Sequence, residues 1–494
     1  MIVRLRSAVA LAATAAVLAA CSGGGGTGQF TNPLTPVPNI GTTPQTQLRI
    51  VGVGDSLTAG VQSGGLSGVP IPGGANAGPA GTTITMPPTQ QNGFYALVFA
   101  QANPAINLSD PVNSPLPLMK PLGGILVPTT SGFPAPVTNY CDANQIAANQ
   151  FATAGAMRLN PNQTPLDVAI PGQTLKESLY MVGPTSDCAI AAAPASFPAN
   201  IVGLNSLIMS EGENFSPVMF SFGPGVPQVN AAAALHGQLA TVWLGSNELL
   251  KFIFSGGNSP VPSFADFQND MNDAIARLQG SGAKVAVATL VDVLGAGTFF
   301  PVTGSPVRPS YAQQISGALQ AQGVPKPAAD AVAGQYAGAE IAQTGLTPGG
   351  LFTLNAFLNT LAAIKGSQPP PTIPASQVVT ASLAAQAQGL NDGYNAAIRA
   401  AVAANSGAIL VDINKTVRTA AAAGGIPINP PKCCSFIYGG GFFSLDGIHP
   451  SNTGYAVIAK TFIDSINAAN AGITIPAIDA KIPAIYAGDI YAPH

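Results

Sequence analysis

The sequence predicts an α/β fold built on a parallel β-sheet, and two observations lead to this prediction. Short apolar runs recur along the 494 residues and are separated by stretches with helical periodicity, the pattern expected of alternating strands and helices. The runs are almost continuously apolar, which favours parallel strands that are buried on both faces of the sheet. The strands that this pattern predicts cover residues 49–54, 167–170, 240–245, 284–291 and 408–413.

Three segments have the spacing of amphipathic helices. The first covers residues 263–278, where Ser263 and Asp266 match a capping box and the apolar residues recur at helical intervals. The second covers residues 381–404 and the third covers residues 452–467. We interpret the apolar face of each helix as part of the hydrophobic core.

Two long segments do not fit a simple alternation of strands and helices. Residues 61–160 are rich in Gly and Pro, and we expect ordered loops with little regular structure there. Residues 297–380 contain Ala-rich helical pieces and a break at three consecutive prolines, 369–371. Loops of this length inside a compact domain are usually either functional or disordered.

Charged residues are scarce in this chain. They make up 8% of the sequence, against about 25% in an average soluble domain. Lys and Arg number 18 against 21 Asp and Glu, and the formal net charge of −3 excludes the basic surface that a nucleic-acid-binding protein needs. The hydrophobic share, 47%, is sufficient for a core. After the N-terminal leader, no apolar run approaches the ~18–20 residues of a membrane-spanning helix.

The N-terminus has the layout of a secretory signal peptide. Arg4 and Arg6 precede an apolar stretch at residues 8–20, and small residues lead to Cys21. The ending Leu-Ala-Ala-Cys resembles the lipobox of bacterial lipoproteins, which implies cleavage before Cys21, acylation of that residue and export. An ordinary cleaved signal with an incidental cysteine is the alternative.

The segment after Cys21 supports the lipoprotein interpretation. Residues 22–46 are rich in Gly, Thr and Pro, which predicts a flexible tether between a lipid anchor and the folded part. Several acyl chains give stable membrane anchoring. Ser22 favours the outer membrane, by analogy with lipoprotein sorting in enterobacteria.

Four further cysteines suggest two disulfides in an exported protein: Cys141, Cys188, Cys433 and Cys434. Three connectivities are possible. A bond between Cys141 and Cys188 leaves Cys433 and Cys434 as a vicinal bridge or as free thiols. In the other connectivities, each of the first two cysteines pairs with one of the last two, which links residues 141–188 to the segment before residue 446. A zinc site is not expected, because the chain has 3 His and none lies at metal-ligand spacing.

A candidate nucleophile follows the first predicted strand. Ser56 comes directly after Gly54 and Asp55, at the carboxyl end of that strand, where active sites of open α/β folds form. A helix N-cap is the competing interpretation, since Asp and Ser both cap helices well. A serine nucleophile also needs a base, because the hydroxyl is weakly nucleophilic by itself.

A candidate base lies near the other end of the chain. Asp446 and His449 are three residues apart and precede the last predicted helix. One turn at this spacing brings the carboxylate to the imidazole, where it fixes the tautomer and stabilises the imidazolium.

These residues belong to four sequence blocks that resemble those of the GDSL, or SGNH, hydrolase family. The blocks are GDSL at residues 54–57, AIPGQT at 169–174, WLGSNE at 243–248 and DGIHPS at 446–451. The resemblance implies a catalytic triad of Ser56, Asp446 and His449. It also implies an oxyanion hole formed by the backbone N–H groups of Ser56 and Gly172 and the side-chain amide of Asn247. One departure is Glu248, which stands where the family usually has Asp.

The same resemblance implies a three-layer α/β/α sandwich with a flavodoxin-like parallel sheet. It covers about residues 47–470, although Ser56 and His449 are 393 residues apart, much farther than in family members of minimal size. We therefore expect a signal peptide at residues 1–21, a tether at 22–46 and one domain at 47–494, enlarged by insertions around 61–160 and 297–380.

The predicted function is hydrolysis of carboxylic esters through an acyl-enzyme, with no cofactor and no metal. The alternatives are acyl transfer or carbohydrate deacetylation on the same fold, and a non-catalytic, surface-anchored binding protein. No basic cluster flanks the four blocks, so we expect small-molecule or lipid esters of uncharged alcohols. Phenylalanines of the long segments are expected to line an apolar pocket: Phe94, Phe99, Phe299 and Phe300.

Overall fold

A computed structural model describes residues 47–72, 85–119, 126–127, 135–136, 158–181, 218–222, 225–426, 428 and 433–492 of the protein. Every described residue lies in one compact unit, Pro38–His494. The predicted signal peptide and tether, with Cys21, lie outside the described residues, as do Cys141 and Cys188. The proposals that concern them stay predictions.

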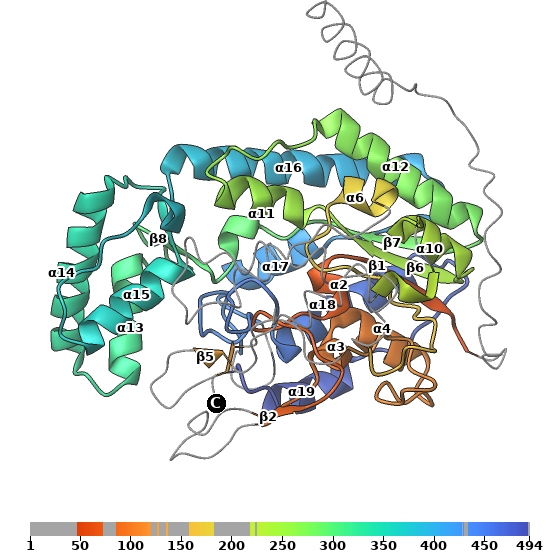
Figure 1. The fold of residues 1–494 in the computed structure, drawn as a ribbon, viewed down its shortest axis with the longest axis horizontal. Coiled ribbons are helices and arrows are strands. Elements are labelled where there is room, and N and C mark those ends of the chain that lie inside the picture. Colours follow the sequence, from red (N-terminus) through yellow and green to blue (C-terminus); the bar gives the residue numbers. More distant parts are fainter. Residues whose placement is uncertain are drawn as a thin grey trace, which may run out of the picture. The chain divides into compact units, whose positions relative to one another are not determined.

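The centre of the fold is a four-stranded parallel sheet, as predicted (Figure 1). Its strands are β1 (Ile50–Gly54), β6 (Leu239–Trp243), β7 (Lys284–Ala288) and β11 (Ala408–Val411), in the spatial order β1-β6-β7-β11. β1 and β6 are buried at every position, which explains why their sequences are continuously apolar. Each strand ends near its predicted limit, and the chain then turns into a loop at the same edge of the sheet.

The predicted strand at residues 167–170 is not a regular strand in the structure. It forms one isolated bridge, between Asp167 and Gly52, and its backbone runs beside β1 with hydrogen bonds from Val168 N to Gly52 O and from Ile170 N to Gly54 O. Counting this segment as the second in chain order gives the spatial order 2-1-3-4-5, which is that of flavodoxin-like folds.

Helices cover both faces of the sheet. On one side lie α10 (Gln228–Ala234), α11 (Ser246–Phe254), α12 (Phe264–Gly280) and α16 (Ala381–Ala404); on the other lie α4 (Phe94–Ala102) and α18 (Asn452–Ala468) (Figure 1). The indole of Trp243, a residue of β6, contacts the helices on this second side of the sheet, because it packs against Phe94 of α4 and Phe462 of α18. The architecture is therefore the three-layer α/β/α arrangement that the sequence predicts.

The three predicted helices are present with nearly the predicted bounds. Ser263 caps α12 by accepting a hydrogen bond from the backbone N–H of Asp266. Phe267 of α12 stacks on Tyr394 of α16, with ring centroids 4.3 Å apart, so the apolar faces of these two helices pack together. The remaining elements are α2 (Ser56–Ala59), β2 (Ile71–Pro72), β3 (Thr85–Met86), α3 (Thr89–Asn92), β4 (Leu126–Val127), β5 (Ala135–Pro136), α6 (Leu175–Tyr180), η4 (Phe220–Phe222), η5 (Val293–Gly295), β8 (Phe299–Pro301), α13 (Tyr311–Ala321), α14 (Lys326–Thr344), β9 (Leu351–Thr353), α15 (Leu354–Lys365), η6 (Ala375–Gln377), β10 (Val378–Val379), α17 (Ile413–Ala422), η7 (Asp479–Lys481) and α19 (Ile482–Ala487).

The insertion at residues 297–380 folds into a lobe with its own hydrophobic core, which we call the helical lobe (residues 299–379). It contains the helices expected there, α13, α14 and α15. It also contains a three-stranded antiparallel sheet, in the order β10-β9-β8, that the sequence pattern did not predict because its strands are only two or three residues long.

The insertion at residues 61–160, where we expected loops with little regular structure, contains the helix α4 besides shorter elements. α4 is a nine-residue helix whose apolar residues lie on all sides, so its sequence has no amphipathic stripe. The phenylalanines expected to line a pocket lie in the cores instead, and each is at most 4% exposed: Phe94, Phe99, Phe299 and Phe300.

Cys433 and Cys434 form a vicinal disulfide, one of the connectivities left open by the sequence. In the described part of the chain, no helix is long and apolar enough to cross a membrane. Over the same residues, no group of three or more His, Cys, Asp and Glu side chains could hold a metal ion.

Candidate active site

Ser56 lies where the strand order of the sheet reverses. β1 has the 167–170 segment on one side and β6 on the other, and ligand sites of such sheets form beyond the carboxyl ends of the strands at this point. Ser56 is the first residue of the short helix α2, and Asp55 is its N-cap, accepting a hydrogen bond from Leu57 N. Ser56 is 8% exposed.

Asn247 reaches the same point from β6. It is the second residue of α11, and its amide Nδ2 donates to Asp55 Oδ2 at 3.0 Å and to the backbone oxygen of Gln173 at 3.0 Å. Burial raises the pKa of Asp55 to about 7, against the hydrogen bond from Leu57 and the charge of His449. Burial therefore disfavours the ionised form of the carboxyl group that accepts the hydrogen bond from Asn247.

Gly172 lies in the turn between the 167–170 segment and α6. Its φ of +86° is readily available only to glycine, which explains the residue type. The backbone N–H groups of Gly172 and Ser56 make no hydrogen bond with any residue in the described ranges. The predicted oxyanion-hole donors, two N–H groups without a partner in the described ranges and one side-chain amide, thus come from three different segments.

Asp446 and His449 form a buried pair. Asp446 Oδ2 lies 3.0 Å from His449 Nδ1 and also accepts from Gly64 N at 2.8 Å, while Oδ1 accepts from the backbone N–H groups of Ile448 and His449, both at 2.8 Å. Burial by itself would raise the pKa of Asp446. The charge of His449 and these hydrogen bonds outweigh burial, so the pKa is lowered and the carboxyl group stays ionised.

The ionised carboxylate fixes the His449 ring in one orientation. An Nδ1–H that donates to Asp446 leaves the lone pair on Nε2, the form needed to accept a proton. His449 Nε2 is buried and has no hydrogen-bond partner among the residues that the structure describes. No hydrogen bond joins Ser56 to His449 in these same residues. The geometry of catalytic groups often tightens only when substrate binds.

A tight turn directly after α2 ties the serine segment to the histidine loop. Ser63 N donates to Ser444 Oγ at 2.8 Å, and Leu445 N donates back to Ser63 Oγ at 3.2 Å. Ser444 in turn donates its hydroxyl to the backbone oxygen of His449. The sequence analysis did not identify these supporting residues. The Ser63–Gly64 pair is a turn signal, and its φ values of +50° and +84° agree with a turn, but a turn signal does not reveal a partner that is distant in sequence.

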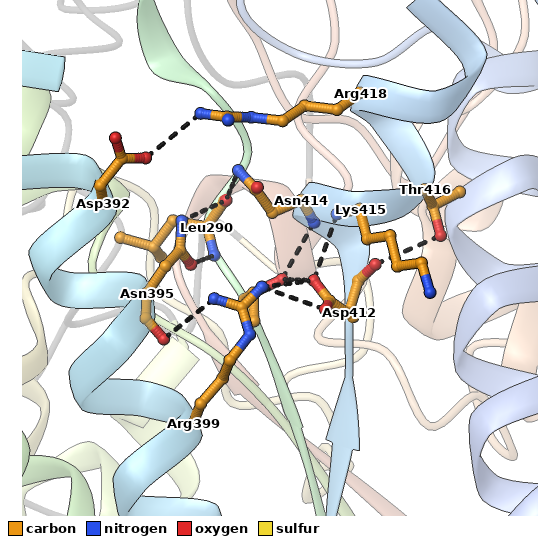
Figure 2. A network of polar contacts seen from close by, with 10 residues as sticks. Leu290, Asp392, Asn395, Arg399, Asp412, Asn414, Lys415, Thr416 and Arg418 are labelled. Carbon is orange, nitrogen blue, oxygen red and sulfur yellow. Dashed lines mark hydrogen bonds and ion pairs between the residues drawn. The ribbon is translucent and has the colours of Figure 1, made fainter.

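A polar network holds Leu290, in the loop after β7 (Figure 2). Asn395 of α16 holds both backbone groups of Leu290 in the loop after β7, and Asn414 of α17 adds a third hydrogen bond to Leu290 O. A Cβ at Gly245 would lie 3.1 Å from the Leu290 side chain, so this clamped leucine packs directly against the turn before Asn247. The ion pair of Arg399 with Asp412 completes the network.

The structure thus brings the predicted site residues together in two linked groups. Asn247 joins the segments of Ser56 and Gly172, and the turn after α2 joins the Ser56 segment to the Asp446–His449 pair. A family model described as "GDSL-like Lipase/Acylhydrolase" matches residues 50–462. No curated protein matches the chain.

Proposed function

The chain belongs to the GDSL-like lipase/acylhydrolase family, a family of ester-acting hydrolases, and from this premise we propose that it cleaves carboxylic esters through an acyl-enzyme on Ser56. The observation that carries the proposal is the buried Asp446–His449 pair, in which the outer ring nitrogen is left without a partner in the described chain. A histidine that is oriented by a carboxylate and has a free Nε2 is suited to activate a hydroxyl.

The proposed reaction has two halves. His449 Nε2 takes the proton of Ser56 as Oγ attacks the acyl carbonyl carbon, and the same proton passes to the leaving alcohol when the ester C–O bond breaks. Water then attacks the acyl-enzyme with His449 again as the base, which releases the carboxylic acid and restores the Ser56 hydroxyl. Asp446 stays ionised throughout and stabilises the imidazolium that forms in each half.

The negative charge on the carbonyl oxygen would be held by three donors. Two are the free backbone N–H groups of Ser56 and Gly172. The third is the Asn247 amide, whose two hydrogens point to Asp55 Oδ2 and Gln173 O. The amide therefore has to share or exchange one of these bonds for the oxyanion, and the bond to Asp55, the neighbour of Ser56, is the one placed to change.

The substrate we propose is a small-molecule or lipid ester with an uncharged alcohol part. The support is the low charge of the chain, since phosphate or sulfate head groups are usually held by Arg or Lys. We also propose that the enzyme acts while anchored to the outer membrane through acylated Cys21, on the strength of the lipobox-like sequence and the tether.

The experiment that tests the function is an ester panel of graded acyl length, run on the purified protein with a Ser56→Ala variant. We expect hydrolysis of p-nitrophenyl acetate or butyrate by the wild type and none above background by the variant. His449→Ala is expected to be equally inactive, whereas His236→Asn, which alters an exposed histidine, keeps full activity. Turnover that persists in Ser56→Ala contradicts the proposal, and release of acyl groups only to an added alcohol would show a transferase.

A further inference from the structure

The first turn and a half of α11 lies along the segment that carries Gly172, and three of its side chains hold that segment. Asn247 Nδ2 donates to Gln173 O at 3.0 Å, Glu248 Oε1 accepts from Leu175 N at 2.7 Å, and Lys251 Nζ lies 3.2 Å from the Glu177 carboxylate. We call these three side chains the α11 latch. The family resemblance assigns a role to Asn247 alone.

Glu248 makes the most buried of the charged contacts in the latch. The residue is 5% exposed, while the Lys251 and Glu177 side chains are 29% and 35% exposed. Its partner, Leu175 N, is a donor in the first turn of α6, where a backbone N–H has no partner within the helix. A carboxylate that accepts such a bond also interacts favourably with the positive end of the helix.

This bond lies close in sequence to Gly172, whose N–H is a predicted oxyanion donor. On one side, the turn is held by the bonds from Ile170 N to Gly54 O and from Gln173 N to Ile170 O. On the other side, Glu248 fixes Leu175, three residues after Gly172. Because the turn is held at both ends, the free N–H of Gly172 keeps one direction.

We propose that Glu248 is a positioning residue, which keeps the Gly172 N–H directed at the oxyanion by accepting the hydrogen bond from Leu175 N. The proposal rests on the proposed function.

Burial and the neighbouring groups act on the pKa of Glu248 in opposite directions. Burial raises its pKa to about 7, the bond from Leu175 and the charge of Lys251 lower it, and Glu177 raises it. From α16, Tyr394 also faces Glu248. Glu248→Gln replaces the carboxyl group by an amide, which keeps an oxygen able to accept the Leu175 bond.

The test measures kcat and KM of Glu248→Ala and Glu248→Gln on p-nitrophenyl butyrate, with active sites counted by end-point titration with an organophosphonate. Glu248→Ala is expected to lower kcat about 10–100-fold, as for a small displacement of a catalytic donor, with KM little changed. Glu248→Gln is expected to recover most of the loss. A variant that merely destabilises the fold lowers the number of titrated sites and not kcat per site.

Glu340→Ala is the matched control, because Glu340 of α14 is also a buried carboxylate with a hydrogen bond, from Thr360, but lies in the helical lobe. Its kcat per site is expected to equal that of the wild type. A kcat of Glu248→Ala within twofold of the wild type overturns the inference, and so does a Glu248→Gln that is as slow as Glu248→Ala. In either case an inactive Ser56→Ala leaves the proposed function standing, whereas an active one removes both.

Discussion

Replacing Asp446 by asparagine exchanges one oxygen of the carboxylate for an NH₂ group in a site that contains only donors. The wild-type carboxylate is fully buried and accepts four hydrogen bonds, from Gly64 N, Ile448 N, His449 N and His449 Nδ1. Each oxygen accepts two of the four. An amide nitrogen in place of Oδ1 faces two backbone donors, Ile448 N and His449 N, that have lost their acceptor. An amide nitrogen in place of Oδ2 faces Gly64 N and the Nδ1 of the His449 ring, which can change tautomer and accept from the amide.

The expected losses of unfolding free energy and of kcat follow from that geometry. A buried donor left without an acceptor costs about 1–3 kcal/mol, so the free energy of unfolding falls by about that amount for each donor that is left unpaired. If the amide nitrogen takes the place of Oδ2, the His449 ring loses the acceptor of its Nδ1–H and adopts the wrong tautomer. Loss of this kind in serine hydrolases lowers kcat by about 10⁴-fold, and we expect Asp446→Asn to lose at least 10³-fold.

Urea unfolding and initial rates at a common temperature measure the two effects. The stability difference should shrink as the pH falls below 3.8. The pKa of Asp446 is lowered in the folded protein, so its contribution to stability is present above the ordinary value and is lost as the wild-type carboxylate becomes protonated. An unfolding midpoint equal to that of the wild type, together with a kcat loss below tenfold, would refute the reasoning.

Three further predictions concern the oxyanion hole, the histidine loop and the membrane anchor. Asn247→Ala is expected to lower kcat about 10²–10³-fold, the usual loss for one oxyanion donor. The control Asn391→Ala, which removes a buried amide of α16, is expected to leave kcat unchanged. Equal kcat values for the two variants contradict the role of Asn247. Gly447→Ala is expected to lower kcat and stability, because its Cβ would lie 2.6 Å from Thr298 N at a φ of +69°. Gly439→Ala is the control, because this residue has a φ of +70° but open space around it, so it shows the effect of positive φ without the clash. Similar kcat values for the two variants would contradict the predicted effect of the clash. Cys21→Ser is expected to move the protein from the membrane fraction to the soluble fraction, which detergent phase separation measures; a wild type found in the aqueous phase disproves the anchor.

The sheet could be predicted from the sequence because its strands are buried on both faces and are therefore continuously apolar. The same property made the predicted carboxyl ends of the strands inaccurate. Leu244 and Leu290 continue the apolar runs beyond β6 and β7 and are fully buried, but they lie in loops. α4 escaped prediction for a related reason. A helix that is apolar on all sides has no stripe to recognise, and its neighbours in sequence are rich in Gly and Pro.

The sequence could predict the contacts within a single motif of the site, but not the contacts between distant segments. Asp446 and His449 are three residues apart, and their contact could be expected from that spacing alone. The bond from Gly64 to Asp446 joins residues 382 apart, and the bond from Leu175 to Glu248 joins residues 73 apart. No local pattern encodes such pairs, because they depend on where the sheet brings separate loops together.

The central claim, that Ser56 is the nucleophile activated by His449, is tested most directly by covalent labelling. The intact protein is treated with a serine-directed organophosphonate, digested and analysed by mass spectrometry to locate the adduct. We predict one adduct per chain, on Ser56, formed rapidly in the wild type and at least 10²-fold more slowly in His449→Ala, as expected when a general base is removed. An adduct on another residue, or labelling of Ser56 at the same rate in both proteins, would contradict the account.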